Sequence, residues 1–365
     1  MKLVATREAL LKPLQAVIGV VERRQTMPIL ANVLLVAKND RLAITATDLE
    51  VELVATAEVD VQTGGEVTVP GRKLLEICRA LPDGAEISVN QAGEKLVVKS
   101  GKSKFSLTTL PAAEFPTIED INAGQSLALP QETLRRLLDK THFSMAQQDV
   151  RYYLNGLLLE TRKQYLRAVA TDGHRLALCQ VEVPGGKLPE QQVIVPRKGV
   201  LELQRLMTGE GTLNLELGSN HIRIQLDGIR FTSKLIDGRF PEYERVIPQD
   251  TSNALAADRL LFRAALQRTA ILSNEKYRGI RLTIQKDTVV LQAHNPEQEE
   301  AEEELAVTYT GADIEIGFNV NYLLDALGAI DAEQVSLALV DGNSSCLLRQ
   351  PDNDDCKYVV MPMRL

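Results

Sequence analysis

The 365-residue sequence contains no tryptophan, only eight tyrosines and only seven phenylalanines. Proteins that hold single-stranded nucleic acid without sequence preference stack the bases on aromatic side chains. We therefore do not expect base stacking to be the main means of binding here. The shortage does not indicate disorder, because hydrophobic residues make up 44% of the chain and charged residues 25%, which is ordinary usage for a globular protein.

Cysteine and histidine are also scarce, with four residues of each type. The cysteines are Cys78, Cys179, Cys346 and Cys356, and none belongs to a CxxC pair. A zinc site or a thiol redox motif is therefore not indicated, and we expect free thiols in a reducing compartment. The histidines show no spacing typical of metal ligands. The sequence predicts no metal and no cofactor.

Long apolar runs are absent as well. No run approaches the roughly 18 residues that a membrane-spanning helix needs. The first residues include Lys2, Arg7 and Glu8 and contain no apolar stretch of the signal-peptide type. We expect a cytoplasmic protein with no membrane partner.

The sequence does contain a pattern that occurs three times. Residues 42–48, 166–172 and 289–295 each alternate apolar and small side chains and end on a polar one, at intervals of 124 and 123 residues. A helical pattern precedes each segment, and a strand leading into a second helix follows it. Such self-similarity at a fixed interval indicates tandem copies of one unit. We therefore predict three domains, over residues 1–124, 125–252 and 253–365.

Each copy is predicted to combine two helices with antiparallel strands. Outside the helical windows, short alternating runs are separated by hairpin signals such as residues 38–41. This is an α+β plan in which helices pack on sheets. Pro13 lies inside the first helical pattern, where we expect it to kink the helix or delay its start. The helical windows cover residues 7–24, 72–80, 131–140, 197–207, 258–269 and 320–328.

The charge distribution favours two opposite interpretations. The net charge is −8 and the pI is near 5.3, which taken alone argues against nucleic acid as a partner. The six helical windows, however, carry 16 basic and eight acidic residues, a net charge of +8, whereas the rest of the chain carries −16. Basic helices in an acidic protein are typical of a lining that contacts phosphates without reading sequence. The alternative is an ordinary solvated helix face, and the last window, with Asp325 and no basic residue, departs from the pattern.

Motifs of common enzyme classes are absent, including GxSxG and the P-loop, so we expect no serine acyl transfer and no ATP hydrolysis. Residues 172–175, Asp-Gly-His-Arg, bring an acid and an imidazole together and are the strongest candidate for general-base chemistry. Asp48 and Asn295 occupy the equivalent positions in the other two copies. This equivalence favours a structural role for Asp172 in a turn after a strand, and the sequence predicts no catalytic residue.

Four segments carry a resemblance to a known family. They are residues 45–50 (Thr-Ala-Thr-Asp-Leu-Glu), 143–156 (Phe-Ser-Met-Ala-Gln-Gln-Asp-Val-Arg-Tyr-Tyr-Leu-Asn-Gly), 171–176 (Thr-Asp-Gly-His-Arg-Leu) and 359–365 (Val-Val-Met-Pro-Met-Arg-Leu). The chain resembles the bacterial sliding clamp, the beta subunit of DNA polymerase III, from its first residue to its last. The resemblance implies three copies of the DNA-clamp fold per chain and a head-to-tail homodimer that closes into a ring of six domains.

The same resemblance implies a function and partners. The ring would encircle double-stranded DNA without sequence preference and would be opened and loaded by a separate clamp loader complex. It would tether the alpha subunit of DNA polymerase III, together with other polymerases and repair proteins, through short peptide motifs, with no catalysis of its own. The competing interpretation is a monomeric peptide-binding scaffold. The mass in solution separates the two, because a clamp is a dimer of 40.3 kDa chains.

The predicted dimer contact joins a basic strand of the first domain to an acidic run of the third. Opposite charges on two edge strands would set partner and register, with Ile271 and Leu272 adding apolar contact. A solvated acidic face is the alternative interpretation of the glutamates. The predicted interface residues are Lys73, Lys102, Lys104, Phe105, Leu107, Ile271, Leu272, Glu299, Glu300 and Glu303.

The resemblance also implies a groove for short linear peptides between the second and third domains. Its Leu, Val, Pro and Met side chains would form an adaptable apolar pocket. Arg175, Arg245 and Arg364 would receive polar or acidic peptide groups. The matching positions are Leu154, Thr171, Gly173, His174, Arg175, Leu176, Pro241, Arg245, Val246, Asn319, Tyr322, Val359, Met361, Pro362, Met363 and Arg364.

A third set of residues is predicted to contact DNA. Its basic side chains would bind phosphates, and Gln148 with the two following tyrosines lies on a loop that would touch the backbone or an exposed strand. The set is Arg24, Arg72, Lys73, Arg79, Gln148, Arg151, Tyr152, Tyr153, Arg197 and Lys198.

Overall fold

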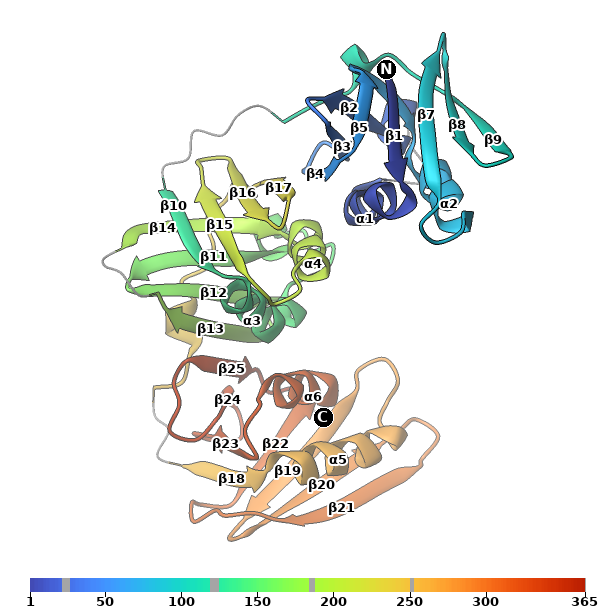
Figure 1. The fold of residues 1–365 in the computed structure, drawn as a ribbon. Coiled ribbons are helices and arrows are strands. Elements are labelled where there is room, and N and C mark those ends of the chain that lie inside the picture. Colours follow the sequence, from blue (N-terminus) through green and yellow to red (C-terminus); the bar gives the residue numbers. More distant parts are fainter. Residues whose placement is uncertain (22–26, 119–124, 184–187, 250–252, 365) are drawn as a thin grey trace. The chain divides into compact units, whose positions relative to one another are not determined.

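The computed structural model describes residues 1–21, 27–118, 125–183, 188–249 and 253–364. The chain, drawn as a ribbon in Figure 1, divides into two compact units. The first consists of Met1–Leu134 and Lys198–Leu235, and the second of Arg135–Arg197 and Ile236–Leu365. The middle third of the chain therefore contributes to both units. Both predicted domain boundaries fall at stretches outside the described residues, 119–124 and 250–252.

The six α-helices of the described residues begin within one residue of the windows that apolar periodicity predicts. Thr6 accepts a hydrogen bond from the amide of Ala9 at 3.3 Å and so caps the first helix. That helix starts at Arg7, so Pro13 does not delay it, and it ends at Val17, earlier than predicted. The helices are α1 (Arg7–Val17), α2 (Gly71–Ala80), α3 (Gln131–Thr141), α4 (Arg197–Leu206), α5 (Arg259–Thr269) and α6 (Val320–Ala329).

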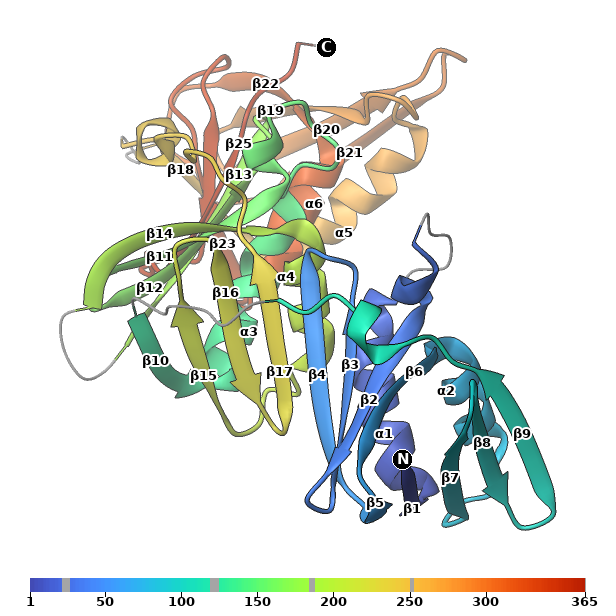
Figure 2. The same cartoon turned by 90° about the horizontal axis from the view of Figure 1, so that it is seen from above.

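The first unit contains two antiparallel sheets. Its strands are β1 (Lys2–Thr6), β2 (Asn32–Lys38), β3 (Arg41–Thr47), β4 (Val51–Glu58), β5 (Asp60–Thr63), β6 (Gly65–Pro70), β7 (Glu86–Ala92), β8 (Lys95–Ser100), β9 (Ser103–Thr108), β10 (Gln125–Pro130), β15 (Thr212–Leu217), β16 (His221–Leu226) and β17 (Ile229–Lys234). The smaller sheet has the order β5-β1-β7-β8-β9, and the larger has β10-β15-β16-β17-β4-β3-β2-β6. Figure 2 shows β17 beside β4. At this pair, strands from the first third and from the middle third of the chain join one sheet.

The second unit repeats this plan. Its strands are β11 (Gly156–Lys163), β12 (Tyr165–Thr171), β13 (Arg175–Glu182), β14 (Leu188–Pro196), β18 (Ala254–Asp258), β19 (Gly279–Gln285), β20 (Thr288–His294), β21 (Glu300–Ala306), β22 (Ile314–Asn319), β23 (Gln334–Ala338), β24 (Cys346–Arg349) and β25 (Cys356–Val360). An eight-stranded sheet has the order β14-β11-β12-β13-β25-β24-β23-β18, and a four-stranded sheet has β21-β20-β19-β22. The pairing of β13 with β25 joins the middle and last thirds of the chain.

Two clusters of buried side chains hold the second unit together. In one, Phe262 of α5 and Leu323 of α6 pack with Ile280 and Phe318 from the four-stranded sheet. The other lies under the eight-stranded sheet near the β13–β25 pair, and its members include Leu158, Val169, Leu176, Leu178, Phe240, Tyr243 and Val359. Burying each such side chain contributes about 1.5–3 kcal/mol. Within the described residues, no helix combines the length and apolar character needed to cross a bilayer.

The expectation of four free thiols is wrong for two of the cysteines. Cys179 and Cys356 lie directly opposite each other on β13 and β25 and form a disulfide. They are 177 positions apart in the sequence, so no local spacing motif predicts that they form a pair. Cys78 and Cys346 are free and buried, and this burial raises the pKa of their thiols to about 11 and about 12.

Candidate functional site

A cavity of about 210 Å³ lies in the second unit, where β13 and β25 meet the segment that follows Phe240. Leu154, Leu176 and Val359 are buried and form an apolar floor, whereas Val246 and Met361 are exposed at the rim. A partly open apolar cavity with a few polar groups is typical of a binding site. The residues that line it are Arg151, Tyr153, Leu154, Thr171, Gly173, Arg175, Leu176, Pro241, Glu242, Tyr243, Val246, Val359 and Met361.

The structure brings nine of the predicted groove residues together around this cavity: Leu154, Thr171, Gly173, Arg175, Leu176, Pro241, Val246, Val359 and Met361. The others lie outside the lining: His174, Arg245, Asn319, Tyr322, Pro362, Met363 and Arg364. Two of these are linked to it directly. The His174 carbonyl accepts a hydrogen bond from the Met361 amide at 2.9 Å, and the Tyr322 ring packs against Arg175.

The turn from Thr171 to Leu176 forms one wall of the cavity. Asp172 Oδ1 accepts hydrogen bonds from the amides of His174 and Arg175 at 2.9 and 3.0 Å. The Thr171 hydroxyl donates to the Arg175 carbonyl at 2.6 Å. Gly173 has a φ of +88°, and a Cβ there would lie 2.9 Å from the guanidinium of Arg151, so a larger residue would be strained.

The same turn occurs in the first copy, as the repeat predicts. Asp48 Oδ1 accepts hydrogen bonds from the amides of Glu50 and Val51 at 2.9 and 2.7 Å. In the third copy, Asn295 Oδ1 accepts one from the amide of Glu299 at 2.9 Å. The carboxylate of Asp172 therefore accepts hydrogen bonds within a turn that follows β12, the position at which the repeat predicts such a turn.

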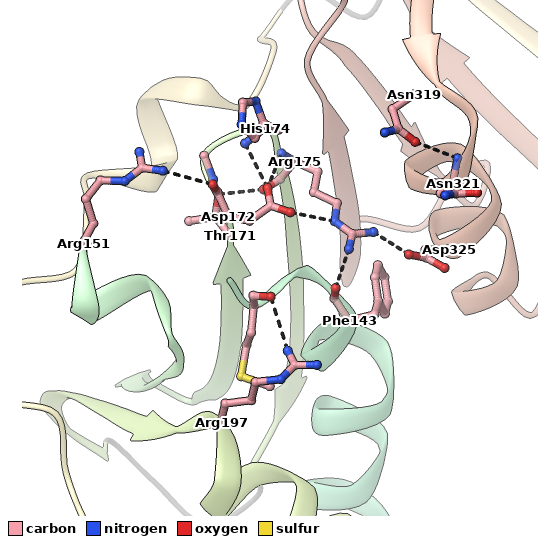
Figure 3. Close-up of polar contacts among 12 residues, drawn as sticks. Phe143, Arg151, Thr171, Asp172, His174, Arg175, Arg197, Asn319, Asn321 and Asp325 are labelled. Carbon is pink, nitrogen blue, oxygen red and sulfur yellow. Dashed lines mark hydrogen bonds and ion pairs between the residues drawn. The ribbon is translucent and has the colours of Figure 1, made fainter. Parts of the chain in front are cut away.

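Arg175 connects the turn to the third part of the chain, as Figure 3 shows. Its Nε donates to Asp172 Oδ2 at 3.1 Å, and its two terminal nitrogens donate to Asp325 Oδ2 at 2.5 Å and to the Phe143 carbonyl at 2.7 Å. The guanidinium also lies 4.5 Å from the Tyr322 ring centroid. These three hydrogen bonds use three of the five N–H donors of the guanidinium, so two donors remain for a polar or acidic peptide group. Arg175 acts here as a tether between β13 and α6.

Removing the Asp172 carboxylate tests this account of the turn. Asp172→Ala is expected to lower the free energy of unfolding by about 2 kcal/mol, because two backbone amides and Arg175 lose their acceptor. Asp172→Asn keeps the Oδ1 acceptor and should lose about half as much. Urea unfolding of both variants measures the difference, and equal losses would contradict the role assigned to Oδ1.

Sequence reasoning assigned Arg151 and Tyr153 to DNA, yet both line the cavity. Arg151 donates to the Asp149 carboxylate at 3.1 and 2.9 Å and to the Asp172 carbonyl at 3.2 Å. The hydrogen bonds from Arg151 lower the pKa of Asp149 to about 2. Two further lining residues, Glu242 and Tyr243, were missed. No local pattern marks them, because they follow Pro241 on an irregular segment.

The remaining residues predicted to contact DNA lie on helices and one loop. Lys73 and Arg79 are exposed on α2 of the first unit, whereas Arg72 donates to the Val21 carbonyl at 2.6 Å. At the start of α4, Lys198 pairs with the buried Asp48 carboxylate. Arg197 donates to the Met145 carbonyl at 3.3 Å. Gln148 and Tyr152 are exposed on the loop before β11, and Arg24 lies outside the described residues.

The residues predicted for the dimer contact lie on two edge strands and their surroundings. β9 is the last strand of the five-stranded sheet and presents Lys104 to solvent, with Phe105 half-buried and Leu107 buried. β21 is the last strand of the four-stranded sheet and carries Glu300 and Glu303. Lys102 directly precedes β9 and Glu299 directly precedes β21, whereas Ile271 and Leu272 follow α5 and Lys73 lies on α2.

The apolar and acidic parts of this surface have different surroundings. Ile271 is 74% exposed in the short helix η7 (Ala270–Leu272). Glu303 accepts hydrogen bonds from Arg268, which lower the pKa of that carboxyl. Arg268 therefore competes for part of the negative charge that the edge strand presents.

Comparisons with known proteins agree with one another. The family models of the DNA polymerase III beta subunit match the N-terminal domain at residues 1–119, the central domain at 128–242 and the C-terminal domain at 244–364. The beta sliding clamp of Pseudomonas putida is 56% identical over 361 residues, covering 98% of both chains. That of Escherichia coli K12 is 52% identical over 366 residues, covering 100% of both.

Solved structures are equally similar. A sliding clamp from Pseudomonas aeruginosa bound to griselimycin superposes with a TM-score of 0.97 at 55% identity, and the beta subunit from Caulobacter crescentus with 0.96 at 42%; each comparison covers 100% of both chains. Similarity of this extent in sequence and structure, over all three matched domains, leads to one conclusion. The chain belongs to the family of the DNA polymerase III beta subunit, the beta sliding clamps.

Proposed function

We propose that this chain is a processivity clamp: two copies join head to tail, encircle double-stranded DNA and hold the replicative polymerase on it. The observation that carries the proposal is the cavity between the 171–176 turn and β25, because nine residues selected for peptide binding line it. Its partners would be the alpha subunit of DNA polymerase III, the clamp loader complex, and other polymerases and repair proteins that carry a short binding motif.

The cavity suits an extended peptide better than a folded partner. About 210 Å³ accommodates one or two apolar side chains, and the exposed Val246 and Met361 extend the apolar surface beyond it. A larger hollow of about 630 Å³ in the first unit is lined by polar and charged groups such as Asp40, Arg41 and Glu58. Its apolar lining residues, such as Val4 and Val59, alternate with these charged groups, whereas the smaller cavity is mainly apolar, so we assign peptide binding to the smaller cavity.

The dimer would form by pairing β9 of one copy with β21 of the other. Both are edge strands, so each has backbone groups free to pair. The lysines on and near β9 would then lie opposite the glutamates on and near β21. Ile271 would become buried in this contact. Sequence-independent DNA binding would come from phosphate contacts of the basic residues Arg24, Arg72, Lys73, Arg79, Arg151, Arg197 and Lys198. Gln148, Tyr152 and Tyr153 would touch the DNA backbone or an exposed DNA strand.

The proposal includes three domains, over residues 1–124, 125–252 and 253–365, each contributing two helices. It assigns the protein to the cytoplasm and gives it no catalytic step. The turn that holds Asp172 supports this last point, because its carboxylate is engaged by two backbone amides and by Arg175.

Processive synthesis tests the proposal. With a polymerase III core, a clamp loader and ATP on a long primed circle, adding this protein should lengthen the product made in a single binding event from short fragments to thousands of nucleotides. Product lengths are measured on a denaturing gel with a challenge template that captures dissociated polymerase. Unchanged lengths with a loader shown to be active would contradict the clamp assignment.

A further inference from the structure

Four polar side chains form a row across four neighbouring strands of the second unit. Glu160 of β11 lies directly opposite Gln192 of β14 and Arg167 of β12, and Arg167 lies opposite Gln180 of β13. The Gln192 amide donates to Glu160 Oε1 at 3.4 Å, and Arg167 donates to Gln180 Oε1 at 2.8 Å. Cross-strand pairing therefore places all four side chains at one level on one face of the sheet.

The hydroxyl of Tyr243 completes this row. It donates to Glu160 Oε2 at 2.6 Å and accepts a hydrogen bond from Arg167 at 2.8 Å. Glu160 is only 5% exposed, and its carboxylate lies 3.9 Å from the Arg167 guanidinium. A buried carboxylate that loses a partner is costly, so the tyrosine hydroxyl is held firmly where it satisfies both charged groups.

The other side of Tyr243 faces the cavity. Its ring is part of the cavity lining and packs edge-to-face on Phe240, with ring centroids 6.4 Å apart. Tyr243 begins the short helix η6 (Tyr243–Val246), which follows the lining residue Pro241 and ends at the lining residue Val246. The next residue, Glu244, accepts hydrogen bonds from Arg162 at 2.5 Å and from Arg167 at 3.2 Å. Two consecutive residues of η6 are thus bound to the sheet.

We propose that this polar row sets the position of η6 and, through it, the wall of the cavity formed by Pro241 and Val246. Glu160 and Arg167 are then positioning residues for peptide binding, although neither lines the cavity. The inference rests on the proposed function in one respect, namely that the cavity is the peptide site. It adds that the affinity of this site depends on hydrogen bonds made behind its wall.

The test measures the affinity of the full-length protein for a fluorescently labelled peptide that carries the clamp-binding segment of a polymerase III alpha subunit. Tyr243→Phe keeps the ring and removes the hydroxyl, so Glu160 and Arg167 lose their shared partner. The dissociation constant should rise roughly tenfold. Tyr309→Phe is the matched control, because the Tyr309 hydroxyl is a buried donor to the Ala312 carbonyl at 2.7 Å and does not line the cavity. Its affinity should stay at the wild-type value.

Two variants of Glu160 separate positioning from general stability. Glu160→Gln keeps an acceptor for the Tyr243 hydroxyl and should bind the peptide within about twofold of wild type. Glu160→Ala should weaken binding as much as Tyr243→Phe, and the double variant should be no weaker than either single variant, since both act on one unit. If Tyr243→Phe does not fold, the difference in peptide affinity between Glu160→Gln and Glu160→Ala tests whether the polar row positions η6.

Hydrogen exchange gives a readout that does not depend on the peptide. In Tyr243→Phe and Glu160→Ala, the amides of residues 242–247 should exchange faster, whereas those of Tyr309→Phe should not change there. Wild-type affinity and unchanged exchange in both variants would overturn the inference. If the wild-type protein itself does not bind the peptide, the proposed function fails instead, and exchange alone still reports whether the row holds η6.

Discussion

Replacing Ile271 and Leu272 with aspartate is expected to convert the dimer into a folded monomer. Ile271 is 74% exposed in η7, which lies beside the acidic edge strand β21. In the proposed dimer these side chains are covered by the partner, so two new carboxylates would lose their hydration where apolar contacts had formed. We expect the dimer dissociation constant to rise by about a thousandfold, roughly 4 kcal/mol. Sedimentation equilibrium should show the mass falling to that of one 40.3 kDa chain.

Leu260→Asp provides a matched control for this experiment. Leu260 is a similarly exposed leucine, 58% accessible, in the first turn of α5 and outside the predicted contact. An acidic residue is well tolerated at a helix start, so this variant should remain dimeric. A dimer that persists in the Ile271 and Leu272 variant would refute the contact we assign. A wild-type protein that is strictly monomeric would instead favour the peptide-binding scaffold.

Deleting residues 361–365 is expected to abolish peptide binding while leaving the dimer intact. Met361 lines the cavity, and its amide donates to the His174 carbonyl at 2.9 Å. The Met363 amide donates to the Gly317 carbonyl at 2.8 Å, so the tail is fixed on both sides. Without it the cavity loses one wall, and we expect the peptide dissociation constant to rise at least about a hundredfold. Fluorescence anisotropy with the labelled peptide measures this loss.

The tail offers its own control in Arg364→Ala. Arg364 is exposed and does not line the cavity, so its removal should change the affinity by no more than a few-fold. Sedimentation equilibrium of the deletion variant checks that the dimer is preserved. An affinity unaffected by the deletion would mean that the peptide binds elsewhere, and the groove assignment would have to be withdrawn.

Local features of the fold could be predicted from the sequence because they depend on neighbouring residues. Apolar periodicity and the repeat placed the starts of the six described helices to within one residue. At α5 a local contact fixes the start, because the Asp258 carboxylate accepts a hydrogen bond from the Leu261 amide at 2.9 Å. The repeat likewise predicted the turn shared by Asp48 and Asp172. The end of α1 was misjudged, because an apolar pattern continues through Ile18 and Val21 after the helix ends.

Contacts between distant strands could not be predicted in this way. Glu160, Arg167, Gln180 and Gln192 show no common spacing, and only the register of four strands aligns them. The disulfide between Cys179 and Cys356 has the same origin in the pairing of β13 with β25. The groove residues were selected through the family resemblance, since an apolar run such as Met361-Pro362-Met363 would otherwise be assigned to a core.

Residue type alone does not show which partners a charged side chain has within the protein. Arg175 and Arg151 were expected to bind acidic peptide groups and phosphates, respectively. In the structure Arg175 is engaged by Asp172 and Asp325, and Arg151 by Asp149. An arginine that completes local hydrogen bonds has the same sequence signature as one that binds a ligand, and only the geometry separates the two roles.

The central claim is that the protein is held on DNA by topology, and retention after a high-salt wash tests it most directly. The protein is loaded by a clamp loader with ATP onto large nicked circles, washed in high salt and then tested before and after the circles are linearised. Salt screens contacts with phosphates but cannot unlink a closed ring. We predict that the protein stays on circles and is lost from linear DNA. Equal loss from both forms, with the loader shown to be active, would contradict the account.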